Sequence, residues 1–280
     1  PQRLIFTPLG NLLVSEGGTE VPNTGRVSIV DRQGNRRSLL EGLPAARAHN
    51  IPAFGPVGLA LNGRTLYVLI GEGDVQVGPP FSLNPNGPSS PIFHSVLRIE
   101  FSSGVDSITS SFQLGRGDHW ALRDGYDITL RNASGDSGTV HLLTSFSSVV
   151  PNILGGTARY RPSDPYGAWL DAGNNALYVI DASAETLIKV NTVTGRYLVL
   201  TRFQPDERAA DPTFVDTVPT AVCPVEDSFL VSFLTATRYP AGASSVRMWS
   251  PSDGNWSRLN PLVGDLTMTN DLACLRGGTP

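Results

Sequence analysis

The sequence predicts an all-β protein, a six-bladed β-propeller with five recognisable blades and a partial sixth. Three observations lead to this prediction. Units of two apolar strands around a Gly, Asn or Asp turn recur along the chain, and a repeat period of roughly 40 to 50 residues is typical of propeller blades. No apolar pattern of helical period persists for about 12 residues, which excludes βαβ crossovers and an α/β domain. The 29 glycines and 22 prolines among 280 residues supply the many turns that short strands need.

Each unit is predicted to begin with a hairpin. In the first, Leu4 to Phe6 faces Leu12 to Val14 across a turn at Gly10 and Asn11, residues that tolerate the positive φ of tight turns. A second pair of strands follows, so each unit has the four strands of a propeller blade. The hairpin units lie at residues 1–16, 55–74, 164–183 and 217–233, and a last one, 268–278, stops where its second strand should begin.

A degenerate third blade is predicted between the second and fourth units, from strands at residues 125–130 and 139–143. The proline-rich segment 75–92 and the segment 115–120 are predicted to be irregular connections. No linker divides the sequence, so residues 1–280 are predicted to form a single propeller domain whose last blade is incomplete.

The charge balance argues against nucleic-acid binding, and the hydropathy of the sequence argues against a transmembrane segment. The chain has 21 basic and 25 acidic residues and a net charge of -4, so it lacks the basic footprint of a nucleic-acid-binding protein. No apolar stretch of about 18 residues predicts a transmembrane segment. Only Lys189 is a lysine, a bias that fits an exported protein and equally a GC-rich genome.

Two cysteines, Cys223 and Cys274, lie outside any zinc-binding spacing. Alignment of the repeats puts them at the same strand position of neighbouring blades, where Phe6, Leu61 and Leu170 stand in other units. Packed sheets lie about 10 Å apart, whereas a disulfide needs Cα atoms within about 7 Å. The repeats therefore predict two separate buried thiols.

Six segments of the sequence share motifs with one family of proteins, namely residues 10–18, 63–74, 163–171, 174–183, 218–249 and 270–275. The most specific motif is the Val-Pro-Thr opening followed by FLTATRYPAGASSV. Together the segments resemble the ScyD/ScyE family of bacterial propeller proteins, which is related in pattern to NHL and gluconolactonase-like propellers. The resemblance implies a secreted or periplasmic six-bladed propeller, and it implies no particular reaction.

Polar side chains after the inner hairpin strands are candidates for a metal site. Oxygen ligands at one mouth of a propeller channel suit Ca²⁺ or Mg²⁺. The resemblance to gluconolactonase-type enzymes implies that such an ion would polarise a lactone carbonyl and activate water. The alternative is that these residues are solvated loop positions or accept backbone hydrogen bonds. The candidate ligands are Glu16, Asp181, Asn270 and Asp271.

A second set of residues is predicted to bind a ligand. His94 and His119 lie in segments that mix polar and aromatic residues, although a loop histidine bonded to the backbone is the commoner case. Glu72 follows an apolar hairpin strand, and Tyr166 lies in the SDPYGAWLD segment. We assign no catalytic residue, because no G-x-S-x-G nucleophile motif occurs.

Three functions stay open at this level. The first is a secreted bacterial propeller that binds a protein or small molecule without catalysis. The second is a lactonase or esterase that uses a divalent metal in the central channel. The third is a structural subunit of a surface assembly, which the low charge, the proline-rich loop and the unfinished blade suggest and which would involve self-association.

Overall fold

The computed structural model describes residues 1–47, 55–77, 82–151, 160–204, 217–235, 241–257 and 259–274. The chain divides into two compact units, which are described separately. Unit 1 comprises Pro1–Val150 with Tyr160–Pro165, and unit 2 comprises Pro151–Arg159 with Tyr166–Pro280. Within the described ranges, no helix has the length and hydropathy to cross a membrane. The single domain predicted from the sequence stays a prediction.

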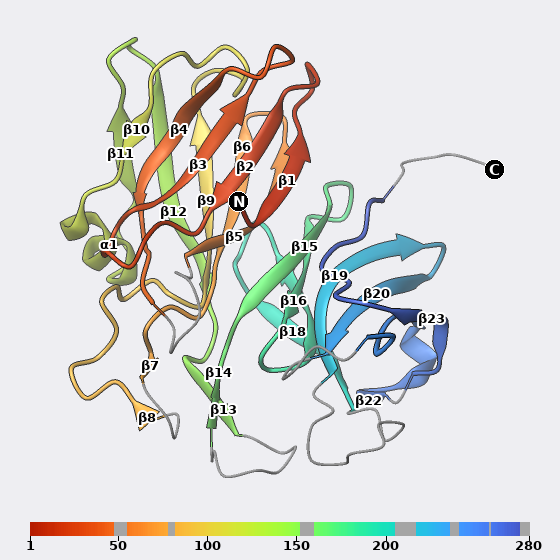
Figure 1. Ribbon diagram of the computed structural model, residues 1–280. Coiled ribbons are helices and arrows are strands. Elements are labelled where there is room, and N and C mark those ends of the chain that lie inside the picture. The colour runs from red at the N-terminus through yellow and green to blue at the C-terminus, as the bar shows by residue number, and fades with distance from the viewer. Residues whose placement is uncertain are drawn as a thin grey trace. The chain divides into compact units, whose positions relative to one another are not determined.

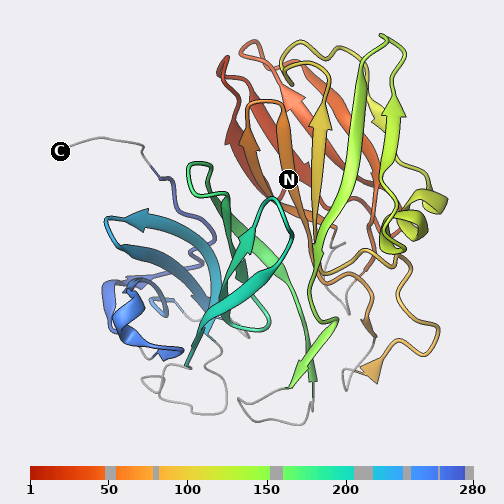
Figure 2. The ribbon, with the colours of Figure 1, turned by 180° about the vertical axis from the view of Figure 1, so that it is seen from behind.

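Unit 1 contains two five-stranded sheets, here called sheets 1 and 2, which pack face to face through β5 (Figures 1 and 2). Their strands, in spatial order, are β1 Arg3–Phe6, β2 Leu12–Glu16, β3 Gly25–Val30, β4 Arg36–Leu43 and β10 Phe112–Gln113 in sheet 1, and β5 Pro56–Asn62, β6 Thr65–Ile70, β9 Ser95–Phe101, β12 Ser137–Ser145 and β11 Ile128–Arg131 in sheet 2. Two small ribbons accompany them, β7 Gln76–Val77 with β8 Ser82–Leu83, and β13 Val149–Pro151 with β14 Tyr160–Pro162.

Unit 2 contains sheets 3 and 4 and a short 3₁₀ helix, Pro251–Asp253. Their strands, in spatial order, are β15 Pro165–Asp171, β16 Ala176–Asp181, β17 Thr186–Asn191, β18 Tyr197–Phe203 and β22 Trp256–Ser257 in sheet 3, and β19 Thr217–Val225, β20 Ser228–Thr235, β21 Ser244–Trp249 and β23 Pro261–Leu266 in sheet 4. Sheets 1, 3 and 4 take up four strands in chain order, as propeller blades do.

The predicted hairpins are confirmed in register. Leu4 faces Val14 and Phe6 faces Leu12 in sheet 1, and Leu59 faces Val68 in sheet 2. These positions could be read from the sequence because a short apolar run on each side of a Gly or Asn turn is typical of a hairpin. Leu13 and Val27 are fully buried between sheets 1 and 2.

The prediction that the degenerate third blade forms a separate sheet is wrong. Its two strands are β11 and β12, and both join sheet 2, where β12 pairs with β9 from Ser95 to Phe101. In the last predicted unit, the described residues 268–274 contain no strand. The described residues thus form four blade-like sheets, and the predicted count of six is not confirmed.

The same connection occurs in both units. After the third strand of its second sheet, the chain crosses to the first sheet, adds a two-residue parallel strand to its fourth strand and then returns. In unit 1 this strand is β10, with Phe112 beside Leu40, and in unit 2 it is β22, with Trp256 beside Arg202. These strands cover part of an outer edge that would otherwise have unpaired backbone groups.

The helix α1, Arg116–Arg123, corrects the prediction of an irregular connection at residues 115–120. It has only eight residues, too few for a helical period to stand out in the sequence. Asp118 caps it by accepting the backbone N–H of Gly115 at 2.7 Å. The helix lies next to β11 and β12 of sheet 2.

The prediction of two free thiols is also wrong. Cys223 and Cys274 form a disulfide, with their Cα atoms 5.5 Å apart. The prediction placed Cys274 on the inner strand of a separate blade. Instead, the segment that contains it returns to β19, which brings the two Cα atoms within the range that a disulfide spans.

Candidate functional site

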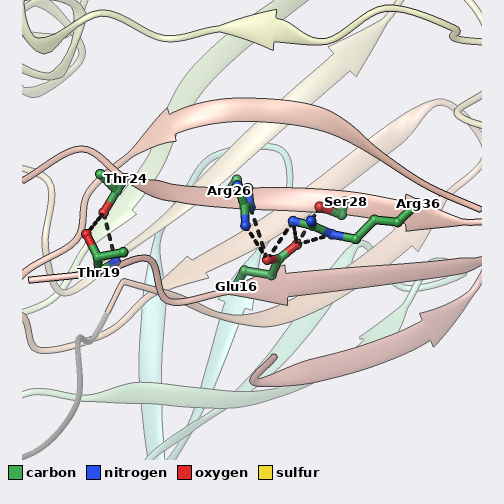
Figure 3. Close-up of polar contacts among 6 residues, drawn as sticks. All are labelled: Glu16, Thr19, Thr24, Arg26, Ser28 and Arg36. Atoms are coloured by element: carbon green, nitrogen blue, oxygen red, sulfur yellow. Dashed lines mark hydrogen bonds and ion pairs between the residues drawn. The ribbon is translucent and has the colours of Figure 1, made fainter. Parts of the chain in front are cut away.

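The outer face of sheet 1 has a pocket of about 440 Å³ at the ends of β2 and β3. Figure 3 shows six polar residues of this region. Pockets of a few hundred cubic ångströms are of the size that holds a small ligand. The pocket is lined by Pro1, Gln2, Glu16, Gly17, Gly18, Thr19, Thr24 and Arg26.

The carboxylate of Glu16 is held on three sides (Figure 3). Arg26 donates from Nε to Oε2 at 3.0 Å, and Arg36 donates from Nη2 to Oε1 at 2.6 Å and to Oε2 at 2.7 Å. The hydroxyl of the fully buried Ser28 donates to Oε1. Strand register produces this arrangement, since Glu16 faces Arg26 and Val14 faces Ser28 across β2 and β3.

These contacts determine the protonation of Glu16. Partial burial disfavours the charged form, but the hydrogen bonds from Ser28, Arg36 and Arg26 outweigh it and lower the pKa of the carboxyl. Two guanidinium groups beside one carboxylate give the cluster a net charge of about +1 at neutral pH. Such a cluster attracts an anion more readily than a divalent cation.

Two threonines order the loop that forms the rim of the pocket. The backbone N–H of Thr19 donates to Thr24 Oγ1 at 2.8 Å, and the two hydroxyl oxygens lie 3.0 Å apart. Gly18 has φ +84°, and a Cβ there would lie 2.7 Å from both Ala45 Cβ and Gly25 N. The loop therefore needs glycine at this position to keep its conformation.

The four predicted metal ligands fall in different units. Glu16 belongs to unit 1, whereas Asp181, Asn270 and Asp271 belong to unit 2. Asp181 is 1% exposed and accepts the backbone N–H of Ala184 at 2.8 Å, as the cap of a turn. Asn270 and Asp271 are exposed. In the described part of the chain, no three His, Cys, Asp or Glu side chains are grouped to hold a metal, so Ca²⁺ or Mg²⁺ binding stays a prediction.

Two of the predicted ligand-binding residues, Glu72 and His94, come together in a buried region of unit 1. The backbone N–H of Glu72 donates to Asp164 Oδ1 at 3.2 Å, and His94 Nδ1 donates to the carbonyl of Ser163 at 2.5 Å. The backbone N–H of His94 also donates to the carbonyl of Gly71 at 3.1 Å. Segment 163–164 therefore joins two loops that lie far from it in sequence.

His94 is buried and neutral. Its side chain is 3% exposed, and burial lowers the pKa of the imidazole to about 4 even though the bond to Ser163 acts in the opposite direction. With its proton on Nδ1, Nε2 is an acceptor, and among the described residues it has no hydrogen-bond partner. Its backbone has φ 56°, in the left-handed region. This histidine is a rigid structural element of the loop.

His119 is a structural residue. It is fully buried on α1, with Nδ1 3.0 Å from Ser90 Oγ and Nε2 donating to the carbonyl of Gly42 at 2.9 Å. Burial lowers the pKa of its imidazole. Both ring nitrogens thus join the helix to the rest of unit 1. Tyr166 lies on β15 in unit 2 and is half-buried.

Sequence reasoning missed the residues that surround Glu16, namely Arg26, Arg36, Thr19 and Thr24. The sequence did contain part of the signal for this cluster, because Arg26 and Ser28 alternate with apolar residues along β3 and so share a face. Their distance from Glu16 depends on the pairing of β2 with β3, which the hairpin prediction did not extend to.

The fold class is that of an all-β, propeller-type protein. No protein-family model matches the chain, and no curated protein does. Similar solved structures include a putative oxidoreductase (glucose dehydrogenase) from Thermus thermophilus, at 14% identity and TM-score 0.38 over 98% of this chain and 86% of that one. The major Malassezia sympodialis allergen Mala s 1 is similar at 11% identity and TM-score 0.37, over 100% and 96%.

A computationally designed protein, Ika8, is similar at 11% identity and TM-score 0.38 over 97% of this chain. The chain spans 64% of the length of that design. Part of the segment that resembles the ScyD/ScyE family, residues 236–240 and 275, lies outside the described residues.

Proposed function

We propose that the chain is an exported bacterial propeller of the ScyD/ScyE type that binds a small polar ligand without converting it. The observation that carries this proposal is the pocket at Glu16, whose lining includes Arg26, Thr19 and Thr24. The side chain of Arg26 is 40% exposed. It bonds Glu16 through Nε and Nη2, and in the described part of the chain its Nη1 has no protein acceptor.

The pocket chemistry favours a hydroxylated carboxylate. A guanidinium nitrogen donates strong hydrogen bonds to a carboxylate. Thr19 Oγ1 accepts the backbone N–H of Val21, and its second lone pair can accept a hydrogen bond from a ligand hydroxyl. Glu16 repels an anion, but Arg26 and Arg36 outnumber it. The disulfide between Cys223 and Cys274 supports export, because disulfides persist in oxidising compartments.

Calorimetric titration of the full chain with gluconate tests the proposal, with sorbitol as the matched ligand that lacks the carboxylate. We expect gluconate to bind more tightly than sorbitol, and Arg26→Gln to weaken gluconate binding at least tenfold. Arg64→Gln is the control, since Arg64 is an exposed arginine that donates to the carbonyl of Ser102 in a different sheet. Equal gluconate affinity in Arg26→Gln and the unmodified chain contradicts this assignment of the pocket.

A hydrolysis assay tests the proposal that the chain does not convert its ligand. Saturable hydrolysis of gluconolactone by the purified chain, above the spontaneous rate, contradicts a purely binding role and favours the metal-dependent lactonase alternative.

A second candidate function is that of a subunit of a surface assembly. Leu4 and Phe6 on the edge strand β1 are 54% and 75% exposed, and large apolar side chains at an exposed edge favour association. Light scattering of the concentrated chain tests this candidate. We expect a concentration-dependent mass that Phe6→Ser reduces, and a strict monomer at high concentration contradicts the candidate.

A further inference from the structure

After β23 the chain turns back across sheet 4. β23 is at one edge of this sheet and β19 at the other. Residues 267–274, here called the strap, run from β23 to β19 without forming a strand, as the dark blue trace in Figure 1 shows. Near its start, Thr267 Oγ1 accepts the backbone N–H of Gly242 at 3.0 Å. At its end lies the disulfide from Cys274 to Cys223.

The strap lies on the face of sheet 4 that points away from the core of unit 2. Val231 and Phe233 belong to that core, so Ser232 between them points to the opposite face. Thr220 Oγ1 lies 2.9 Å from Ser232 Oγ and 3.0 Å from the carbonyl oxygen of Thr269, to which it donates. The strap is therefore attached through side chains of this opposite face.

Three residues of this face are buried although they are outside the core. Ser232 is fully buried, Ala221 is 1% exposed and Val246 is 9% exposed. Ser232 faces both Ala221 and Val246 in the neighbouring strands, so the three form one row. A strap that is bonded to Thr220, next to this row, covers part of it.

Most of the strap is exposed. Five of its eight residues are exposed, namely Thr267, Met268, Asn270, Asp271 and Ala273. A segment with so little burial gains little hydrophobic stabilisation, so its covalent attachment is the strongest link to the sheet. Cys223 is 51 residues from Cys274, and the bond greatly restricts the conformations open to the strap.

We propose that the Cys223–Cys274 disulfide is a redox-sensitive cross-link, and that its reduction releases the strap and uncovers the face of sheet 4 around Ser232. A dithiol reductant supplies two electrons and two protons. The S–S bond breaks, two thiols form, and the reductant becomes a disulfide. Cys274 then leaves with the strap, while the thiol of Cys223 stays on the uncovered face and becomes accessible.

Hydrogen exchange of the full chain, read by mass spectrometry, tests this proposal in the oxidised form, after treatment with a dithiol, and in Cys274→Ser. We expect the peptide of β19, to which the strap is attached, to exchange at least tenfold faster in the second and third samples, and iodoacetamide to modify Cys223 only in those samples. Peptides from β16 to β18 should keep their protection, because the release is local.

A control variant separates the disulfide from the hydrogen bond. Thr220→Val removes the donor to Thr269 but keeps both cysteines, so the peptide of β19 should remain protected until a dithiol is added. Three results overturn the proposal: an intact mass that does not rise by 2 Da on reduction, unchanged exchange of β19 in Cys274→Ser, or loss of protection throughout unit 2 when the disulfide is broken.

Discussion

The buried His94 makes the stability of unit 1 depend on pH. In the folded chain its pKa is lowered to about 4 because the imidazole is buried, whereas an exposed histidine has a pKa of about 6.5. The unfolded chain thus takes up a proton at a higher pH than the folded chain does. The contribution of His94 to stability is fully present above pH 6.5 and decreases as the pH falls toward 4.

These two pKa values give the size of the effect. Between pH 7 and pH 5 the unfolded form of this histidine becomes almost fully protonated, while the folded form stays neutral. The free energy of unfolding then falls by about 2 kcal/mol from this group alone. The side chain is 3% exposed, so solvent screens the effect little.

Urea denaturation at pH 7 and pH 5 measures the effect, with His94→Asn as the comparison. Asparagine tolerates the left-handed backbone of position 94, where φ is 56°, but does not titrate. We expect the variant to be less stable at pH 7 and to lose about 2 kcal/mol less than the unmodified chain between the two pH values. Other groups that titrate in this range are common to both proteins. An equal loss in both would refute the assignment of a buried, neutral imidazole.

Two further predictions concern the histidine of α1 and the carboxylate of the pocket. His119→Phe leaves the carbonyl of Gly42 and the hydroxyl of Ser90 without their partner, so the free energy of unfolding, measured by urea denaturation, should fall by about 2 to 5 kcal/mol. A change below about 1 kcal/mol contradicts a structural role for His119. Glu16→Gln removes the charge that pairs with two half-exposed arginines, so the free energy of unfolding should fall by about 1 kcal/mol at low salt and by less at high salt. Because the pKa of Glu16 is lowered in the folded chain, this contribution is present above pH 4.5 and is lost as the pH falls through the folded pKa. A variant as stable as the unmodified chain at low salt contradicts the pairing.

The hairpins of this chain could be predicted because their signals are local. Leu4 to Phe6 and Leu12 to Val14 are short apolar runs on the two sides of a turn that contains Gly10, and the structure pairs them as predicted. The same reasoning failed for the strands of the predicted third blade. A hairpin pattern shows that two strands pair with each other, but it does not show which sheet the pair then joins.

The candidate site was predicted only as single residues. Glu16 and Glu72 could be selected because each follows an apolar strand, and Glu16 does line a pocket. Its partner Arg36 lies 20 residues away on a strand that is not adjacent to β2 in the sheet. No local pattern connects these two residues, so the ion pair was not predicted.

The cysteines show the same limit most clearly. The repeat alignment placed Cys274 on a strand, whereas the strap that contains it crosses sheet 4 to reach β19. The sequence by itself determined the all-β class, the hairpins and their turns, because apolar runs and turn chemistry act between residues that are close along the chain. Tertiary structure alone decided the number of sheets, the arginine contacts of Glu16, the partner of His94 and the disulfide, because each depends on contacts between segments whose distance in space is set by the order of the strands.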